Sequence, residues 1–139
     1  MKVRFVLVLM LLVGFILYGC ANQKSEAQNA VKNFLKASYE KDYDGIRKFV
    51  DFDDILKQMG QETGEVIDNE LKKAVIDEII KEVCKISKGD YEKGISSLSV
   101  EIDKNDSRYA TAAYSTTLKS NVALRLEKRK TGWIIIRIG

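Results

Sequence analysis

Histidine is absent from this chain of 139 residues. No histidine is therefore present to act as a general base, to activate a nucleophile or to ligate a metal ion. The sequence also lacks a Gly-rich phosphate loop, a Cys-x-x-Cys pair and a Ser-centred nucleophile elbow. These absences exclude the most recognisable catalytic and metal-binding patterns, and we expect neither a cofactor nor a metal site.

Proline is absent as well, which does not discriminate between functions, and cysteine is scarce. Cys20 and Cys84 are the two cysteines, too few for a disulfide framework. Cys84 falls within an apolar helical pattern, which favours a buried thiol that behaves as a small hydrophobic side chain. A reactive thiol, or one that joins two copies of the chain in a homodimer, is the alternative.

Neither sign of charge is in large excess, with 23 Lys and Arg against 20 Asp and Glu. Lys2 and Arg4 belong to an N-terminal segment of special composition. Without residues 1–19 the chain has 21 basic and 20 acidic residues. So small an excess gives no reason to expect a nucleic-acid partner.

The N-terminal segment has the pattern of an export signal. Lys2 and Arg4 are followed by an uncharged stretch over residues 5–21, which opens with the continuous apolar run 5–13. A basic segment followed by an apolar one is typical of a secretory signal peptide. We therefore expect the chain to be exported.

The apolar segment ends in Leu17-Tyr18-Gly19-Cys20. An aliphatic residue three positions before a cysteine and a small residue directly before it resemble the lipobox of bacterial lipoproteins, although Tyr18 is bulkier than the residue usual there. The resemblance implies cleavage between Gly19 and Cys20, and a Cys20 thiol that carries diacylglycerol and takes up palmitate. The protein would then be anchored by lipid to a bacterial membrane in the cell envelope.

Two alternatives stay open for this segment. An uncleaved membrane anchor needs at least about 17 apolar residues, which residues 5–21 only just supply. A conventional secreted protein would be cleaved without receiving lipid. All three interpretations export the remainder of the chain, which we divide into a lipidated cysteine with a short tether (20–24) and a single domain (25–139).

The spacing of apolar residues over 25–139 predicts helices followed by strands. Ser25 and Gln28 resemble a capping box that starts the first helix. Apolar residues at three- and four-residue spacing predict helices, one of them stopped by Gly60 and followed by a loop over 61–64. These helices are expected over residues 25–41, 46–50, 53–59 and 65–86.

From Lys88 onward the pattern changes to alternation of apolar and polar residues. The strands are expected over residues 98–102, 108–118, 122–127 and 133–138. The short turns between them favour antiparallel hairpins. We therefore predict an α+β fold, in which N-terminal helices pack on a curved antiparallel sheet of about four strands.

The order of these elements resembles a known superfamily. Ala30-Val31-Lys32-Asn33-Phe34-Leu35-Lys36-Ala37, the acidic and aromatic turn at 41–44 and the closing Gly132-Trp133 hairpin carry the resemblance. They are similar to the nuclear transport factor 2-like, cystatin-like superfamily, and especially to small lumazine-binding-like bacterial lipoproteins of unknown function. The long charged helix expected over 65–86 departs from that pattern.

This resemblance, over residues 25–139, implies a curved sheet that wraps a long helix into a cone. The mouth of the cone can hold a small apolar molecule. The superfamily includes binding proteins, dehydratases, isomerases and subunits without chemistry, so the fold does not fix a function. The expected pocket residues are aromatic: Tyr39, Tyr43, Tyr114 and Trp133. Trp133 has a second interpretation, as a plug of the hydrophobic core.

Acid–base chemistry in such a cone would use an aspartate base with tyrosine donors. The groups available are Tyr39, Tyr43, Asp44, Asp53, Asp54, Tyr109 and Tyr114. Most of these carboxylates fall at turns or helix starts, where capping is the ordinary role. We therefore assign no catalytic residue.

The leading hypothesis is a membrane-anchored lipoprotein that binds a small apolar ligand or an envelope partner. A cofactor-free isomerase, dehydratase or hydrolase is the alternative, as is a structural lipoprotein whose cone is filled by its own side chains. The basic hairpin 128–130 is interpreted as a solvated turn. With Arg125 and Arg137 nearby, it has a second interpretation as a contact with anionic lipid headgroups.

Overall fold

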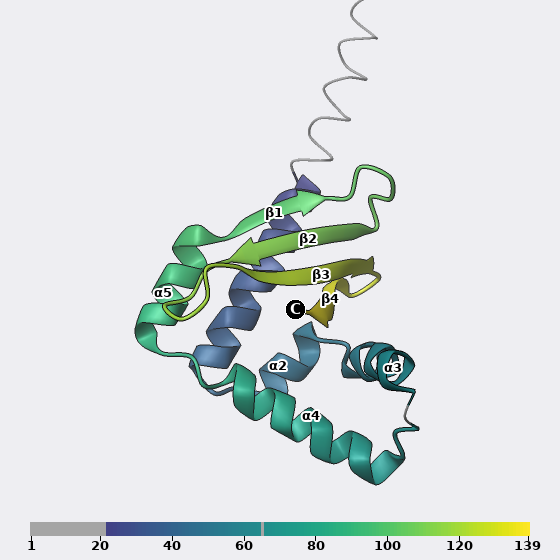
Figure 1. Ribbon diagram of the computed structural model, residues 1–139. Coiled ribbons are helices and arrows are strands. Elements are labelled where there is room, and N and C mark those ends of the chain that lie inside the picture. Colours follow the sequence, from purple (N-terminus) through teal and green to yellow (C-terminus); the bar gives the residue numbers. More distant parts are fainter. Residues whose placement is uncertain (1–21, 65) are drawn as a thin grey trace, which may run out of the picture.

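The computed structural model describes residues 22–64 and 66–139. Over these residues the chain is an α+β domain in which helices pack with a four-stranded antiparallel sheet, which confirms the predicted fold class (Figure 1). The expected signal peptide and the residues Gly19 and Cys20 lie outside the described residues.

Helices occupy the first part of the described chain and strands the second. An N-terminal helix covers residues 22–39. The later helices are α2 (Tyr43–Phe49), α3 (Phe52–Thr63), α4 (Asn69–Val83) and α5 (Lys88–Ser97). The strands are β1 (Ser99–Ile102), β2 (Tyr109–Tyr114), β3 (Val122–Arg129) and β4 (Gly132–Ile138).

The sheet is a meander in the order β1-β2-β3-β4, and each strand pairs antiparallel with the next. Its inner face is apolar because alternate residues of a strand point to the same side. Ala110 of β2 lies opposite Leu126 of β3, and both are 0% exposed. Two residues along the ladder, Ala112 and Leu124 repeat this arrangement.

The N-terminal helix shares a hydrophobic core with this inner face and lies behind the strands in the view of Figure 1. Ala27, Val31, Phe34 and Leu35 recur at the spacing of one helical face and are all buried. Burial of each large apolar side chain stabilises the fold by roughly 1.5–3 kcal/mol. The helix and the sheet are therefore held together mainly by this stripe.

The start of this helix differs from the expectation. The helix is already formed at residue 22, so it includes residues 22–24, which the sequence analysis assigned to the tether. Ser25 is an exposed helical residue. The predicted capping box of Ser25 and Gln28 is therefore wrong, because an N-cap residue stands outside the helix that it caps.

The predicted stop of a helix at Gly60 is also wrong. Helix α3 runs through Gly60 to Thr63, so the predicted loop over 61–64 is largely helical. A glycine inside a helix costs only about 1 kcal/mol relative to alanine. The helix ends instead at Gly64, whose φ of 71° is left-handed and whose N–H donates to the Gly60 carbonyl.

Helix α4 is shorter than the predicted 65–86, and α5 was not predicted. The side chain of Asp68 caps α4 by accepting a hydrogen bond from the Leu71 N–H. At α5, Ser87 and Asp90 form a reciprocal capping box. Such a box can be recognised in a sequence. However, α5 contains Gly89 and Gly94 and its apolar residues do not recur at a clear helical spacing, so the segment does not have the pattern of a helix.

The second strand ends at Tyr114, although the prediction extended it to residue 118. Residues 115–121 instead form a loop closed by local hydrogen bonds. The Thr116 N–H donates to the Lys119 carbonyl at 2.8 Å, and the Ser115 hydroxyl donates to the Ser120 carbonyl at 2.7 Å. Polar side chains that satisfy the backbone locally compete with a strand ladder.

A β-bulge interrupts the pairing of β3 with β4. The register shifts between Arg125 and Leu126, which leaves Ile136 without a partner in β3. In a regular strand Ile135 and Ile138 would point to opposite faces. The bulge instead lets Ile135 join the core while Ile138 packs against the same core.

We predict that the core of the sheet is sensitive to the loss of a single side chain. Leu124→Ala removes a side chain that is 1% exposed in β3, and it should lower the free energy of unfolding by about 2–5 kcal/mol. Leu118→Ala, the same chemical change at a residue that is 92% exposed, should change it by less than about 0.5 kcal/mol. Urea unfolding measures both values, and equal effects would contradict the described core.

Candidate functional site

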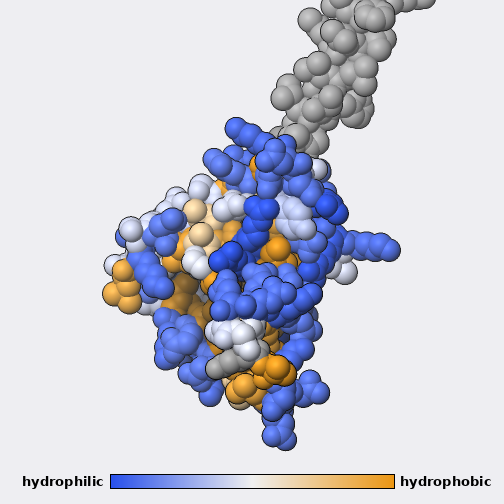
Figure 2. Space-filling model, turned by 45° about the vertical axis from the view of Figure 1, so that its right-hand side comes forward, coloured by the Kyte–Doolittle hydropathy of each residue, from blue (hydrophilic) through white to orange (hydrophobic). Residues whose placement is uncertain are grey.

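A cavity of about 400 Å³ lies at one end of the sheet. Its walls come from the C-terminal half of the N-terminal helix, the end of α4, the start of α5 and the strand ends that flank the loop 115–121. The apolar members of its wall are Phe34, Leu35, Val83, Ile86, Tyr114, Leu118, Val122 and Ile138. Figure 2 shows apolar surface in a hollow on the left of the molecule, between hydrophilic surfaces above and below.

The floor of this cavity is shaped by a close approach of three elements. Gly94 of α5 is buried, and a Cβ atom at this position would lie 3.4 Å from side-chain atoms of both Leu35 and Tyr114. Glycine therefore lets α5 lie close to the N-terminal helix and to the end of β2. A larger residue at position 94 would press on two side chains of the cavity wall.

Tyr114 supplies the cavity wall with a phenol group. Burial raises the pKa of Tyr114 to about 12, so the hydroxyl keeps its proton at neutral pH and remains a hydrogen-bond donor. Within residues 22–64 and 66–139, no group hydrogen-bonds to this hydroxyl. It is therefore available to a ligand that carries an acceptor atom.

Asp90 is the buried carboxylate of the cavity wall, at 8% exposure. The Thr117 N–H donates to one of its oxygens at 2.7 Å, and the Thr117 hydroxyl donates to the same oxygen. The Ser87 hydroxyl donates to the other oxygen at 2.9 Å, and the Ser87 N–H does so at 3.3 Å. Asp90 thus caps α5 and also ties the loop 115–121 to that helix.

These hydrogen bonds decide what Asp90 can do chemically. The donors of Thr117, and then those of Ser87, hold the pKa of the Asp90 carboxyl well below its ordinary value of 3.8. An efficient general base has a pKa near the working pH. Because all the described donors favour the ionised form, Asp90 is a weak base, and its geometry fits a structural role.

The polar rim of the cavity includes a pair of opposite charges and an unpaired one. Lys85 forms an ion pair with Glu82. Lys119, on the loop 115–121, has no ion-pair partner in the described part of the chain. An apolar wall, one free phenol donor and a charged rim suit the binding of a mainly apolar molecule.

The structure brings one of the four predicted pocket residues to this cavity, namely Tyr114. Tyr39 stacks on Tyr91 with ring centroids 5.0 Å apart and is 38% exposed. Tyr43 is 50% exposed and borders a separate hollow of about 350 Å³. Trp133 is 4% exposed and belongs to the hydrophobic core.

The position of Trp133 leaves one polar atom unsatisfied. Its indole N–H is buried and has no hydrogen-bond partner among the residues that the structure describes. Buried donors are usually paired. Trp133 is absent from the wall of the 400 Å³ cavity, so the geometry agrees with its interpretation as a core plug.

The remaining acid–base candidates lie away from the cavity wall. Asp44 and Asp54 lie in the first turns of α2 and α3, and Asp53, also at the start of α3, forms an ion pair with Lys72. Tyr109 has the guanidinium group of Arg125 over its ring, 4.9 Å from the centroid. None of these groups meets the Tyr114 hydroxyl at the cavity.

Sequence reasoning missed Ser38, Asp90 and Val122 as members of the cavity wall. Ser38 is 1% exposed, and its buried hydroxyl is satisfied because it donates to the Phe34 carbonyl at 2.8 Å. The capping box at Ser87 and Asp90 is the signal that would have located α5, and with α5 one side of the cavity.

Cys84, at the C-terminus of α4, is a free and buried cysteine. Burial raises the pKa of its thiol above the ordinary value of 9.0. A protonated and buried thiol reacts slowly. Its surroundings therefore agree with the interpretation of Cys84 as a small hydrophobic side chain.

Comparison with known proteins gives no relationship: no family model, curated protein or solved structure significantly matches the chain. Over the described ranges, no cluster of three or more metal-ligating side chains is placed to hold an ion. In the same ranges, no helix is both long and apolar enough to cross a membrane.

We predict that Asp90 makes the stability of the domain depend on pH. Because its pKa is lowered in the folded state, its contribution is complete above pH 3.8 and is lost as the pH falls below that value. Asp90→Asn should lower the melting temperature at neutral pH, and its difference from the unmodified protein should shrink on acidification. Thermal melts across the acid range measure this.

Glu92→Gln in the same helix is the matched control. Glu92 is exposed and forms an ion pair only with Lys88, at 3.7 Å, so the change should have little effect on the melting temperature. If Asp90→Asn and Glu92→Gln gave the same dependence of melting temperature on pH, the hydrogen bonds of Asp90 would not be what holds the loop 115–121 to α5.

Proposed function

We propose that this protein is an exported bacterial lipoprotein whose single domain binds a small apolar ligand without catalysing a reaction. The lipid on Cys20 would hold the domain at a membrane in the cell envelope. The cavity at the end of the sheet would hold the ligand. Support for the anchor comes from the sequence, and support for the binding role comes from the cavity.

The cavity wall is the observation that carries the binding role. Its volume of about 400 Å³ falls within the range of small-molecule sites, which is about 300–1,000 Å³. Apolar side chains from two helices and three strand ends converge on it, together with the unpartnered Tyr114 hydroxyl. A ligand with a compact apolar body and one acceptor atom would satisfy both features.

Catalysis in this cavity is the less favoured function. An acid–base mechanism would need a carboxylate whose pKa lies near neutrality. Asp90 shares the wall with Tyr114, yet both of its oxygens accept hydrogen bonds from Ser87 and Thr117 and its pKa is lowered. Proton abstraction by Asp90 would break the contacts that hold α5 and the loop.

We also propose that the domain is a member of the nuclear transport factor 2-like superfamily, with the cone that this fold implies. A long N-terminal helix against an antiparallel meander, and a cavity at the end where that helix finishes, support this assignment. The β-bulge at Ile136 adds the bend that a curved sheet requires.

We predict that filling the cavity abolishes ligand binding. Val122→Phe adds bulk to the cavity wall and takes up space that a ligand would occupy, so affinity for a fluorescent probe with apolar rings, such as anilinonaphthalene sulfonate, should fall at least about tenfold. Native mass spectrometry of the purified protein should also lose any copurified small molecule.

Val66→Phe is the matched control for this experiment, because Val66 is 93% exposed and does not line the cavity. It should bind the probe like the unmodified protein. Melting temperatures of both variants verify that they are folded. Unchanged binding by a folded Val122→Phe protein would refute the cavity as the binding site.

We predict that the protein takes up labelled palmitate through position 20. Cys20→Ser should abolish the label and block cleavage after Gly19, because both steps would depend on the Cys20 thiol. Cys84→Ser, at the other cysteine of the chain, should change none of these readouts. If the Cys20→Ser protein still took up palmitate, the proposal that Cys20 carries the lipid anchor would be wrong.

A further inference from the structure

The described chain begins at the end of the domain where two hairpin turns meet. Residues 103–108 connect β1 to β2, and residues 130–131 connect β3 to β4, so the meander places both turns at the same end of the sheet (Figure 1). Glu26, in the first turns of the N-terminal helix, forms an ion pair with Lys128 at 3.7 Å. The start of the helix therefore lies beside the second turn.

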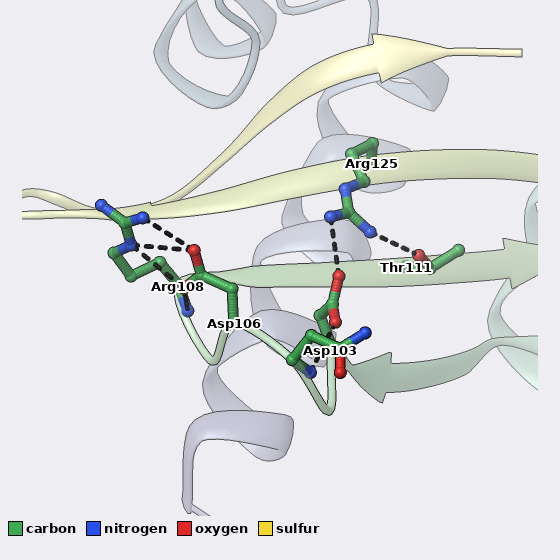
Figure 3. A network of polar contacts seen from close by, with 6 residues as sticks. Asp103, Asp106, Arg108, Thr111 and Arg125 are labelled. Carbon is green, nitrogen blue, oxygen red and sulfur yellow. Dashed lines mark hydrogen bonds and ion pairs between the residues drawn. The ribbon is translucent and has the colours of Figure 1, made fainter.

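We define the turn face as residues 22–26, 103–108 and 127–131. Its acidic side chains are paired. Figure 3 shows two of these pairs, in which Arg108 meets Asp106 at 2.7 Å and Arg125 meets Asp103 at 2.9 Å. Hydrogen bonds from Arg108 lower the pKa of Asp106 to about 2, so this pair stays charged at neutral pH.

The remaining acids at this end are neutralised in the same way. Arg129 forms ion pairs with Glu127 at 2.7 Å and with Asp51 at 2.6 Å, and Glu26 pairs with Lys128. By contrast, Lys24, Lys104 and Lys130 have no ion-pair partner among the described residues. Three flexible cations thus stand on the turn face without a carboxylate to neutralise them.

The cavity lies at the opposite end of the sheet from this face. The N-terminal helix contributes Phe34, Leu35 and Ser38 to the cavity wall, and at 1.5 Å per residue these lie at least about 18 Å along the helix axis from residue 22. The strand ends in the same wall, Tyr114 and Val122, lie at the opposite end of the sheet from the two turns.

We infer that the turn face lies on the anionic headgroups of the membrane, with Lys24, Lys104 and Lys130 as its lipid contacts. This orientation rests on the lipid anchor proposed above. A single residue separates Cys20 from residue 22, which is already helical, so these two positions, two steps apart in the chain, lie at most about 7 Å apart at about 3.5 Å per step. The turn face is therefore held at headgroup distance, where each lysine is attracted to anionic lipid.

This orientation specifies the source of the ligand. With the turn face on the membrane, the cavity at the far end of the sheet would stand in the aqueous compartment, so the ligand of the proposed binding site would reach it through water. A lipid drawn directly from the bilayer beneath the domain would have to travel around it. The inferred ligand class is therefore a sparingly soluble small molecule that diffuses in the envelope.

The test is lysine acylation of the full lipidated protein in vesicles, read by mass spectrometry. Vesicles of phosphatidylcholine alone are compared with vesicles that also contain phosphatidylglycerol. Lys24, Lys104 and Lys130 should be labelled severalfold more slowly on the anionic vesicles at low salt, and raised salt should remove this protection. Lys93 of α5 and Lys119, both exposed and unpaired at the cavity end, are the controls and should not change.

Flotation with the vesicles is measured first and separates the two proposals. Protein that does not float lacks the anchor, and the orientation falls with it. Protein that floats but shows equal labelling on both vesicle types, or protection at Lys93 and Lys119 instead, keeps its anchor and overturns the orientation. The double variant K104E/K130E, which changes only exposed turn residues, should float and lose the protection at the remaining Lys24, while its melting temperature is retained.

Discussion

The contact between the apolar stripe of the N-terminal helix and the inner face of the sheet determines most of this structure. Val31, Phe34 and Leu35 meet Leu124 and Leu126 in one core, and both partners are too narrow to hide their apolar surface alone. The helix runs from the turn face, where Glu26 pairs with Lys128, to the opposite end of the sheet, where Ser38 joins the cavity wall. The later helices add to this pair: α5 contacts β2, and α3 contacts β4.

The cavity follows from the same arrangement. Near Ser38 the helix reaches the end of the sheet, where the strands stop at Tyr114 and the loop 115–121 begins. Helix α5 covers this end from one side only, held by the Asp90 carboxylate at its first turn. Space is left where a longer second strand would have filled it. A hydrogen-bonded carboxylate thus shapes an apolar site without taking part in its chemistry.

The sequence predicted the fold class and most elements because these depend on period and on turn chemistry. The alternation of Leu124 and Leu126 with charged residues identifies β3 without any tertiary information. The cavity was not predictable in the same way. Its wall combines Ile138, which faces the core only because a bulge shifts the strand at Ile136, with α5, which has almost no apolar period. Aromatic residues were a poor guide, since Trp133 is used for packing and Tyr39 for stacking on another ring.

The bulge in β4 has a consequence for assembly of the domain. Ile135 and Trp133 complete the core beneath the N-terminal helix, whereas Ile136 is buried outside that cluster, where Gln58 of α3 donates a hydrogen bond to its carbonyl. One strand therefore closes two separate hydrophobic layers. Among the described strands it is also the last to be synthesised, so both layers stay open to water until it arrives. Complete folding of the domain therefore has to wait until β4 has been synthesised.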